Sequence, residues 1–231
     1  LRKGVTVADF FRNEWFEKIF CDGISDSDNM NLMAYAVASR RYRNLKIRDI
    51  VGDFDKSSEK QFGAMIFELG AGTDFVAFRG TDRSLVGWKE NLNLSFMDAV
   101  PAQIGAAEYV EDMAWHCPER PLRIGGHSKG GNDVVSAYAM ADEATRKKVI
   151  HLDNFDGPGV NEAFREKYKA GYEELAQKLA NYYPQDSIVG LLLNNNPGEN
   201  HFIYSKASDS SYNIGIYSNE HIVKLVVNEA P

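Results

Sequence analysis

A serine stands between two glycines in the run Gly126-His127-Ser128-Lys129-Gly130. On a sharp turn from a strand to a helix, such a serine adopts a strained backbone conformation that lifts its hydroxyl group clear of the sheet. Large side chains two residues away on either side would collide across the turn, which accounts for the glycines at 126 and 130. We therefore interpret Ser128 as a nucleophile for acyl transfer.

The segments on either side of this run suit a strand and a helix. Residues 121–124 (Pro-Leu-Arg-Ile) can form a short strand that leads in, and residues 133–140 can form a helix that leads out. The alternative is a glycine-rich turn that carries an idle serine.

A serine hydroxyl becomes a strong nucleophile only when a base takes its proton and an acid orients that base. Where the serine lies on such a turn, the chain order is serine, acid, histidine. His201 and His221 both lie far enough after the serine to fit this order. We prefer His221, which lies in a polar loop before an apolar run, because catalytic residues concentrate in loops. His127 adjoins the serine, and we expect it to pack into the fold.

Three aspartates compete for the role of the acid. Asp186 follows the strand-like residues 181–183, and ligands of open α/β sheets bind at the carboxyl ends of strands. Asp153 and Asp156 lie at the end of the preceding predicted strand. Asp156 can instead organise the turn that follows it, and Asp186 can cap a turn through Ser187. We predict Asp186 as the acid, with Asp156 and Asp153 as alternatives.

Acyl transfer also needs hydrogen-bond donors aimed at the oxyanion that forms on the attacked carbonyl. The backbone N–H of Lys129, directly after the serine, is one candidate. Thr81 follows a strand-like segment and offers its N–H and its hydroxyl as the second. Taken alone, Gly80 and Thr81 would indicate only a tight turn.

Strand-like and helix-like segments alternate along most of the chain. This alternation predicts an α/β fold with a mostly parallel sheet and helices on both faces. The expected strands are residues 62–69, 73–78, 121–124, 149–155, 181–183, 202–205 and 222–227, the first two joined as a hairpin by Gly70-Ala71-Gly72. The expected helices are residues 85–94, 102–115, 133–140 and 161–179, with Gly171 as a candidate break in the last.

The first 45 residues read as a helical segment. Thr6 and Asp9 resemble a capping box, and apolar side chains follow at helical spacing (Phe10, Phe11, Trp15, Phe16 and Ile19). A second helix is expected to start near Ser27. We predict a single domain over residues 1–231, with this helical segment before a catalytic core at residues 60–231.

The bulk composition indicates a soluble protein. Of 231 residues, 44% are hydrophobic and 26% are charged, with a net charge of −7, which argues against nucleic-acid partners. No apolar run approaches the roughly 20 residues of a membrane span. Cys21 and Cys117 fit reduced thiols and have no metal-ligand spacing. We expect a cytoplasmic protein without a cofactor or metal.

Several motifs resemble known lipases. The class 3 (fungal-type) lipases are resembled by Phe78-Arg79-Gly80-Thr81, Trp88, Gly126–Gly131 and Pro158–Asn161. The bacterial lipase-like α/β hydrolases of the Mbeg1-like family (DUF2974) are resembled more closely by Val100–Gln103, Asn154–Gly159 and Asp186–Gly190. Together these likenesses cover roughly residues 28–225.

The resemblance implies an α/β-hydrolase fold with Ser128 as nucleophile, Asp186 as acid and His221 as base. It implies Thr81 and Lys129 as the oxyanion donors. The substrate would be a small-molecule or lipid acyl ester, with transient contact to a membrane or lipid surface.

Two features depart from the family pattern. The segment after His221 lacks the usual aromatic residue, and Lys129 replaces a common leucine. We expect the Lys129 side chain to be solvated; the alternative is a preference for acidic acyl substrates. Residues 92–100 are apolar enough for a lid, and a plain packing helix fits them equally well.

The same residues would also suit a thioesterase, a peptidase or an acyltransferase, because these enzymes share the serine turn and the oxyanion hole. A catalytically silent hydrolase fold that binds a ligand is the remaining alternative.

Overall fold

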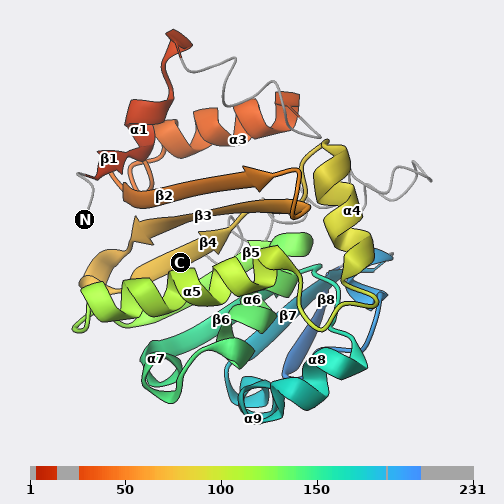
Figure 1. The fold of residues 1–231 in the computed structure, drawn as a ribbon. Helices are drawn as coiled ribbons and strands as arrows, with labels where there is room; N and C mark the ends of the chain where they lie inside the picture. Colours follow the sequence, from red (N-terminus) through yellow and green to blue (C-terminus); the bar gives the residue numbers. More distant parts are fainter. Residues whose placement is uncertain (1–3, 15–25, 186, 204–231) are drawn as a thin grey trace.

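The computed structural model describes residues 4–14, 26–185 and 187–203. Its centre is a sheet of eight strands whose order in space follows their order in the chain (Figure 1). Strands β1 to β4 pair antiparallel, and β4 to β8 pair parallel. The strands are β1 (Val5–Thr6), β2 (Lys46–Asp55), β3 (Lys60–Glu68), β4 (Asp74–Phe78), β5 (Leu122–His127), β6 (Val149–Phe155), β7 (Leu179–Pro184) and β8 (Glu199–Ile203).

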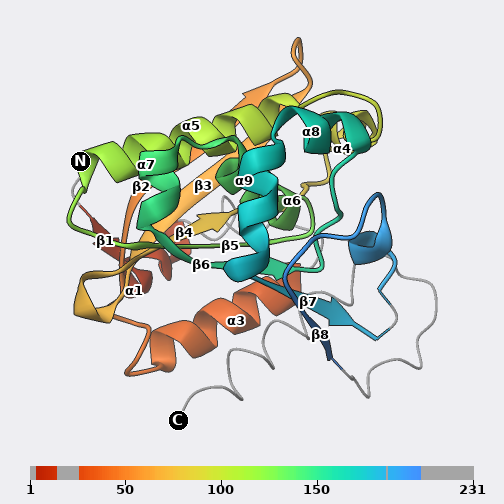
Figure 2. The same cartoon turned by 90° about the horizontal axis from the view of Figure 1, so that it is seen from below.

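Helices lie on both faces of the sheet (Figure 2). The helices α5 to α9 cover one face, and α1 and α3 lie on the other. The α-helices are α1 (Val7–Phe10), α3 (Asp26–Ala38), α4 (Leu85–Asn93), α5 (Pro101–His116), α6 (Lys129–Met140), α7 (Glu143–Lys148), α8 (Glu162–Lys167) and α9 (Lys169–Glu174). Short 3-10 turns are η1 (Gly70–Gly72), η2 (Leu175–Gln177) and η3 (Val189–Leu191).

The main core lies between the sheet and the helices α5 and α6. Alternate strand residues point into it, among them Ile66, Val76 and Ile124, which are fully buried. Helix α6 is buried along nearly its whole length, since it packs on β5 and β6 and against α5 and α9. The α/β architecture with a mostly parallel sheet is therefore confirmed.

Most of the predicted elements are confirmed. The hairpin of β3 and β4 turns at η1, where Ala71 and Gly72 have φ of +59° and +76°. Helices α3, α4 and α5 and strand β6 lie where they were expected. The predicted strand at residues 222–227 lies outside the described residues, as does Cys21.

Strand β2 was missed. A bulge between Arg48 and Val51, where Asp49 has φ of +51°, shifts the register of β2 against β3. Apolar and polar residues therefore do not alternate regularly along its sequence. Most of its residues are exposed or half-buried, so hydrophobic patterning gives little signal there.

Two helix predictions were partly wrong. The capping box at Thr6 is present, with the Thr6 N–H donating to Asp9 Oδ2 at 2.8 Å, but α1 ends at Phe10. The rest of that predicted helix, with Trp15, Phe16 and Ile19, lies outside the described residues. The expected helix over residues 161–179 is divided at Tyr168, not at Gly171. Gly171 lies inside α9 instead, where a Cβ would stand 2.3 Å from the Ala139 carbonyl oxygen. The glycine lets α9 pack closely on α6.

Candidate active site

Ser128 lies on the turn between β5 and α6. Its φ of 56° and ψ of −125° fall in a region that non-glycine residues rarely adopt. The turn is so tight that a Cβ on residue 126 would stand 2.2 Å from the Gly130 carbonyl oxygen. A Cβ on residue 130 would stand 2.5 Å from the Phe78 carbonyl oxygen. Both glycines are therefore required by close backbone packing, as the sequence pattern indicated.

The loop after β4 lies directly beside this turn. Strands β4 and β5 are parallel, with Phe78 opposite Gly126, so the loops that follow them begin at the same edge of the sheet. A Cβ on Gly80 would stand 2.9 Å from the His127 carbonyl oxygen and 3.7 Å from the Ser128 Cβ. The Thr81 hydroxyl interacts with the side chain of Asn91 on α4, whose Nδ2 lies 2.8 Å from Thr81 Oγ1.

Lys129 is the first residue of α6, where a backbone N–H has no acceptor within the helix. Its N–H is thus free of intrahelical bonding and lies next to the serine. The Lys129 side chain, however, is 1% exposed. Our expectation that it would be solvated was wrong. The ammonium group points into the protein because three oxygen-bearing groups there interact with it.

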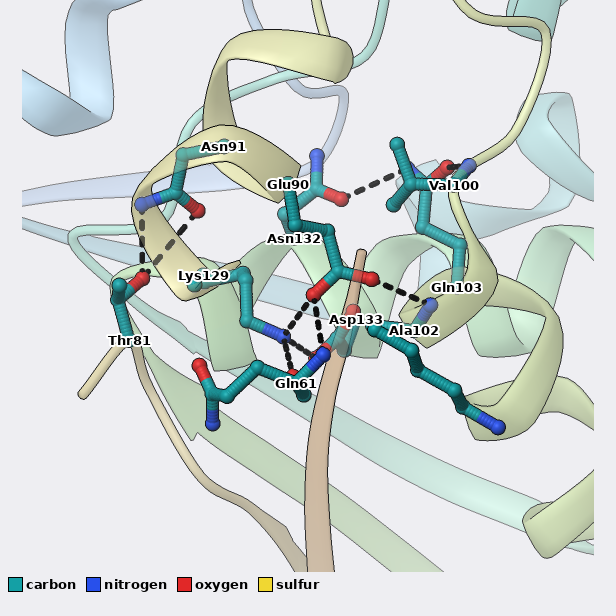
Figure 3. A network of polar contacts seen from close by, with 12 residues as sticks. Gln61, Thr81, Glu90, Asn91, Val100, Ala102, Gln103, Lys129, Asn132 and Asp133 are labelled. Carbon is teal, nitrogen blue, oxygen red and sulfur yellow. Dashed lines mark hydrogen bonds and ion pairs between the residues drawn. The ribbon is translucent and has the colours of Figure 1, made fainter. Parts of the chain in front are cut away.

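Figure 3 shows these partners of Lys129. The ammonium donates to the Gln61 carbonyl oxygen of β3 and lies 3.3 Å from Glu90 Oε2 on α4. It also lies 3.6 Å from Asp133 Oδ2, one turn further along α6. Burial raises the pKa of Asp133 to about 6, although the nearby Lys129 opposes the shift. We call Lys129, Glu90 and Asp133 the elbow cluster.

His127 ends β5, directly before the serine. Burial lowers the pKa of its imidazole to about 4, so the ring is neutral at physiological pH. A neutral ring places no positive charge beside the Ser128 hydroxyl.

The aspartates that compete for the acid differ in their surroundings. Asp153 is held within β6 by Arg123 Nη2 and by His151 Nε2, each 3.1 Å from one of its oxygens. Asp156 follows β6 with φ of +54°. Its carboxylate accepts a hydrogen bond from the Ser187 hydroxyl and one of 3.1 Å from the Gly190 N–H. Asp186 lies outside the described residues.

The end of β6 meets the serine turn. The Ser128 N–H donates to the Phe155 carbonyl oxygen at 3.0 Å, and Asp156 N–H donates to Tyr182 on β7 at 2.9 Å. The loops that follow β5, β6 and β7 therefore begin at one edge of the sheet. This is the edge at which the sequence analysis predicts the site.

Of the two candidate bases, the structure describes one. The His201 ring on β8 stacks on Tyr182, with centroids 4.9 Å apart. Its Nε2 lies 3.5 Å from Glu199 Oε1. His221 lies outside the described residues.

The segment suggested as a lid is not a continuous helix. Helix α4 ends at Asn93 and turns follow it. Leu94 and Val100 are buried in the core, whereas Leu92 and Phe96 are 69% and 70% exposed. Part of this segment therefore packs, and part presents apolar side chains outward.

The sequence profile of the Mbeg1-like family matches residues 36–211, which is more than half of the chain. The chain belongs to the Mbeg1-like family. The fold of this Mbeg1-like protein is an α/β-hydrolase fold, with the serine turn between a central parallel strand and the helix that follows. No curated protein matches the chain.

Several solved structures are similar to this Mbeg1-like protein. The native Rhizomucor miehei lipase propeptide complex is 15% identical, with a TM-score of 0.48 over 95% of this chain and 78% of that one. A triacylglycerol lipase from Penicillium expansum is 14% identical, with a TM-score of 0.43 over 88% and 82%. A predicted CIB-like hydrolase from Thermoplasma acidophilum is 12% identical, with a TM-score of 0.41 over 78% and 97%. The likeness concerns the fold alone.

The described part of the chain offers neither a membrane-spanning helix nor a cluster of metal ligands. No helix there is long and apolar enough to cross a membrane. No group of three or more His, Cys, Asp and Glu side chains there could hold a metal ion.

Sequence reasoning missed the buried partners of Lys129. Glu90 and Gln61 lie 39 and 68 residues away from it in the chain, so no local pattern links them. One signal was available, namely the i, i+4 spacing of Lys129 and Asp133 at the start of the helix.

Proposed function

We propose that this protein is a serine hydrolase that cleaves a carboxylic ester through an acyl-enzyme. The observation that carries this proposal is the conformation of Ser128, a non-glycine residue with φ of 56° on the turn between β5 and α6. Strain of this kind persists only where the surrounding structure imposes it, and it concentrates at functional sites.

The reaction follows from the roles assigned to the residues. Ser128 Oγ attacks the ester carbonyl carbon while His221 takes the hydroxyl proton, and Asp186 orients the imidazole. The N–H groups of Thr81 and Lys129 stabilise the oxyanion of the tetrahedral intermediate. His221 then returns the proton to the departing alcohol, and water hydrolyses the acyl-enzyme by the same steps.

The surroundings of the other aspartates support Asp186 as the acid. The carboxylate of Asp153 is occupied by Arg123 and His151. Asp156 bonds to Ser187 and Gly190, so it organises the loop after β7. Gln185 and Ser187 lie directly beyond the carboxyl end of β7, the edge at which Ser128 also lies.

Apolar side chains near the site support an acyl ester substrate, in solution or at a lipid surface. Leu85, Leu92 and Phe96 are exposed along α4 and the turn that follows it, and Trp88 is half exposed. Helix α4 itself follows the loop beyond the carboxyl end of β4 (Figure 1). These side chains would suit transient contact with a lipid surface.

The first test is labelling with a fluorophosphonate probe, followed by turnover of p-nitrophenyl esters, acyl-CoA thioesters and peptides. We expect Ser128→Ala to lose labelling and to lose at least about 10⁴-fold in kcat, as the loss of a serine nucleophile does elsewhere. The matched control is Ser136→Ala on the same helix, where the buried hydroxyl bonds only to backbone carbonyl oxygens of its own helix, those of Asn132 at 2.8 Å and Asp133 at 3.3 Å. This control should label normally.

The panel also separates the competing assignments. A preference for thioesters or peptides would change the reaction class while keeping the nucleophile. His221→Ala should abolish turnover and His201→Ala should spare it if His221 is the base; the reverse result would exchange their roles. A Ser128→Ala protein with full activity would refute the mechanism.

A further inference from the structure

The Lys129 ammonium is a buried charge with an unusual set of partners. It lies below the serine turn and is received by β3, α4 and α6 through the Gln61 carbonyl, Glu90 and Asp133. Burying an ammonium group is costly unless its partners are well placed, and buried ion pairs are often no better for stability than apolar side chains. Stability alone therefore does not explain why this cluster is buried.

Gln61 connects the ammonium to the loop that carries Thr81. Its backbone carbonyl receives Lys129, and its side chain brackets the loop on both sides of Thr81. The Gln61 Nε2 donates to the Gly80 carbonyl oxygen at 3.4 Å, and its Oε1 accepts from the Asp82 N–H at 3.3 Å. The two N–H groups assigned to the oxyanion, those of Thr81 and Lys129, are thus tied to one residue.

Glu90 fixes this arrangement from the other side. Its carboxylate is fully buried and accepts from the Gln61 N–H at 3.0 Å and from the Ala102 N–H at 2.9 Å. The next residue on α4, Asn91, bonds the Thr81 hydroxyl. Helix α4 therefore contacts the side chains of both residues that carry the proposed oxyanion donors, Thr81 through Asn91 and Lys129 through Glu90 (Figure 3).

We infer that the Lys129 side chain, held by Glu90, and the Gln61 side chain are positioning groups that set the distance between the two oxyanion donors. This inference rests on the proposed function, since it concerns the same site. Donors must be held within about 0.5 Å of the productive geometry to be effective. A side chain that anchors the donor residue to the neighbouring strand supplies that precision.

The test compares Lys129→Met with wild type in ester hydrolysis and in affinity for an alkylboronic acid, which bonds to the serine as an analogue of the tetrahedral intermediate. Methionine keeps the backbone N–H and much of the volume but loses the ammonium. We expect kcat and boronate affinity to fall together by about 100-fold, the low end of the effect of losing one oxyanion donor, with KM nearly unchanged. Gln61→Met should cause a smaller loss, about 10-fold, with the same split between kcat and KM.

Lys178→Met is the matched control. Like Lys129, this lysine turns its ammonium toward backbone carbonyls; it donates to those of Arg146 and Val149 at 2.8 and 2.7 Å. It lies before β7, at the amino end of the parallel strands. We expect its kcat and boronate affinity to equal those of the wild type, even if its melting temperature falls.

Each outcome decides one question. If Lys129→Met does not fold, Lys129→Met combined with Asp133→Asn removes one of the two carboxylates left behind, and the same measurements apply. If the folded Lys129 variant and Gln61→Met keep the wild-type kcat and boronate affinity, and turnover still depends on Ser128, the positioning role alone is overturned. Wild-type protein without Ser128-dependent turnover or labelling overturns the proposed function, and the positioning role with it.

Discussion

Two buried groups of charges lie at opposite ends of the parallel strands, and they are built differently. At the amino end, Asp74 of β4 is fully buried and receives the guanidinium groups of Arg48 and Arg120; Arg120 Nε lies 2.8 Å from Asp74 Oδ1. We call these three residues the amino-end cluster. At the carboxyl end, the elbow cluster has one ammonium for two carboxylates. The Asp133 carboxylate has no hydrogen-bond donor within reach among the described residues, and its contact with the Lys129 ammonium is a longer ion pair of 3.6 Å.

The difference separates a structural cluster from a functional one. Every charged oxygen of Asp74 has a donor, and the partners come from β2 and from the loop before β5, so the cluster holds the sheet together. The elbow cluster leaves one carboxylate poorly satisfied, directly below the proposed nucleophile. Proteins tolerate such unfavourable arrangements mainly at functional sites, and the two clusters should therefore respond oppositely to mutation.

Asp74→Asn should have the largest effect. The change removes the carboxylate that the buried Arg48 and the half-buried Arg120 share, although Arg48 keeps its contacts with Asp49 and Glu68. Breaking a buried ion pair costs about 3–5 kcal/mol. Chemical denaturation measures this loss in the free energy of unfolding. The control is Asp98→Asn, whose exposed pair with Lys167 at 3.7 Å should contribute nothing measurable. An Asp74 variant as stable as wild type would mean that the two clusters do not differ.

Asp133→Asn should instead raise the free energy of unfolding. The folded pKa of Asp133, about 6, lies above its ordinary value of 3.8, so the native state holds this proton more tightly than the unfolded state. The contribution of this group to wild-type stability is therefore lost as the pH rises from about 4 to about 6. We expect the variant to be more stable than wild type by up to about 3 kcal/mol at pH 8, and by about half as much at pH 5.

Denaturation curves of both proteins at the two pH values test this difference. A variant that is less stable than wild type at pH 8 would show that the Asp133 carboxylate contributes stability through Lys129, and the contrast with Asp74 would disappear.

His127 should have the smallest effect on the free energy of unfolding. Its contribution should change with pH in the opposite direction to that of Asp133. Its folded pKa, about 4, lies below its ordinary value of 6.5, so the unfolded state binds the proton first. Wild-type stability contributed by this group is thus lost as the pH falls from about 6.5 to about 4. We expect this loss between pH 7 and pH 5 to be about 1–2 kcal/mol, since the ring keeps some exposure.

His127→Gln should remove that acid-induced loss, as judged by denaturation at both pH values. The exposed His116, replaced in the same way, serves as the control and should leave the wild-type pH dependence in place. Equal pH dependence in wild type and His127→Gln would contradict the burial of the imidazole as its cause.

Local sequence patterns anticipated much of the fold. The hairpin of β3 and β4 is marked by its glycine turn, and helix α5 begins with a proline at its first residue. Strand β2 escaped because its bulge breaks the alternation of side chains on which strand prediction depends. The division of α8 from α9 at Tyr168 escaped because no glycine or proline marks the break.

The sequence by itself determined the turn at Ser128, since only glycines two residues before and after the serine permit backbone contacts as close as those found. It also determined the α/β class through the alternation of periods. The tertiary structure alone decided the fate of the Lys129 side chain. Whether a lysine is solvated or buried depends on which oxygens lie within its reach, and the oxygens of Gln61 and Glu90 come from segments far away in the chain. Long-range contacts of this kind leave no local pattern to read.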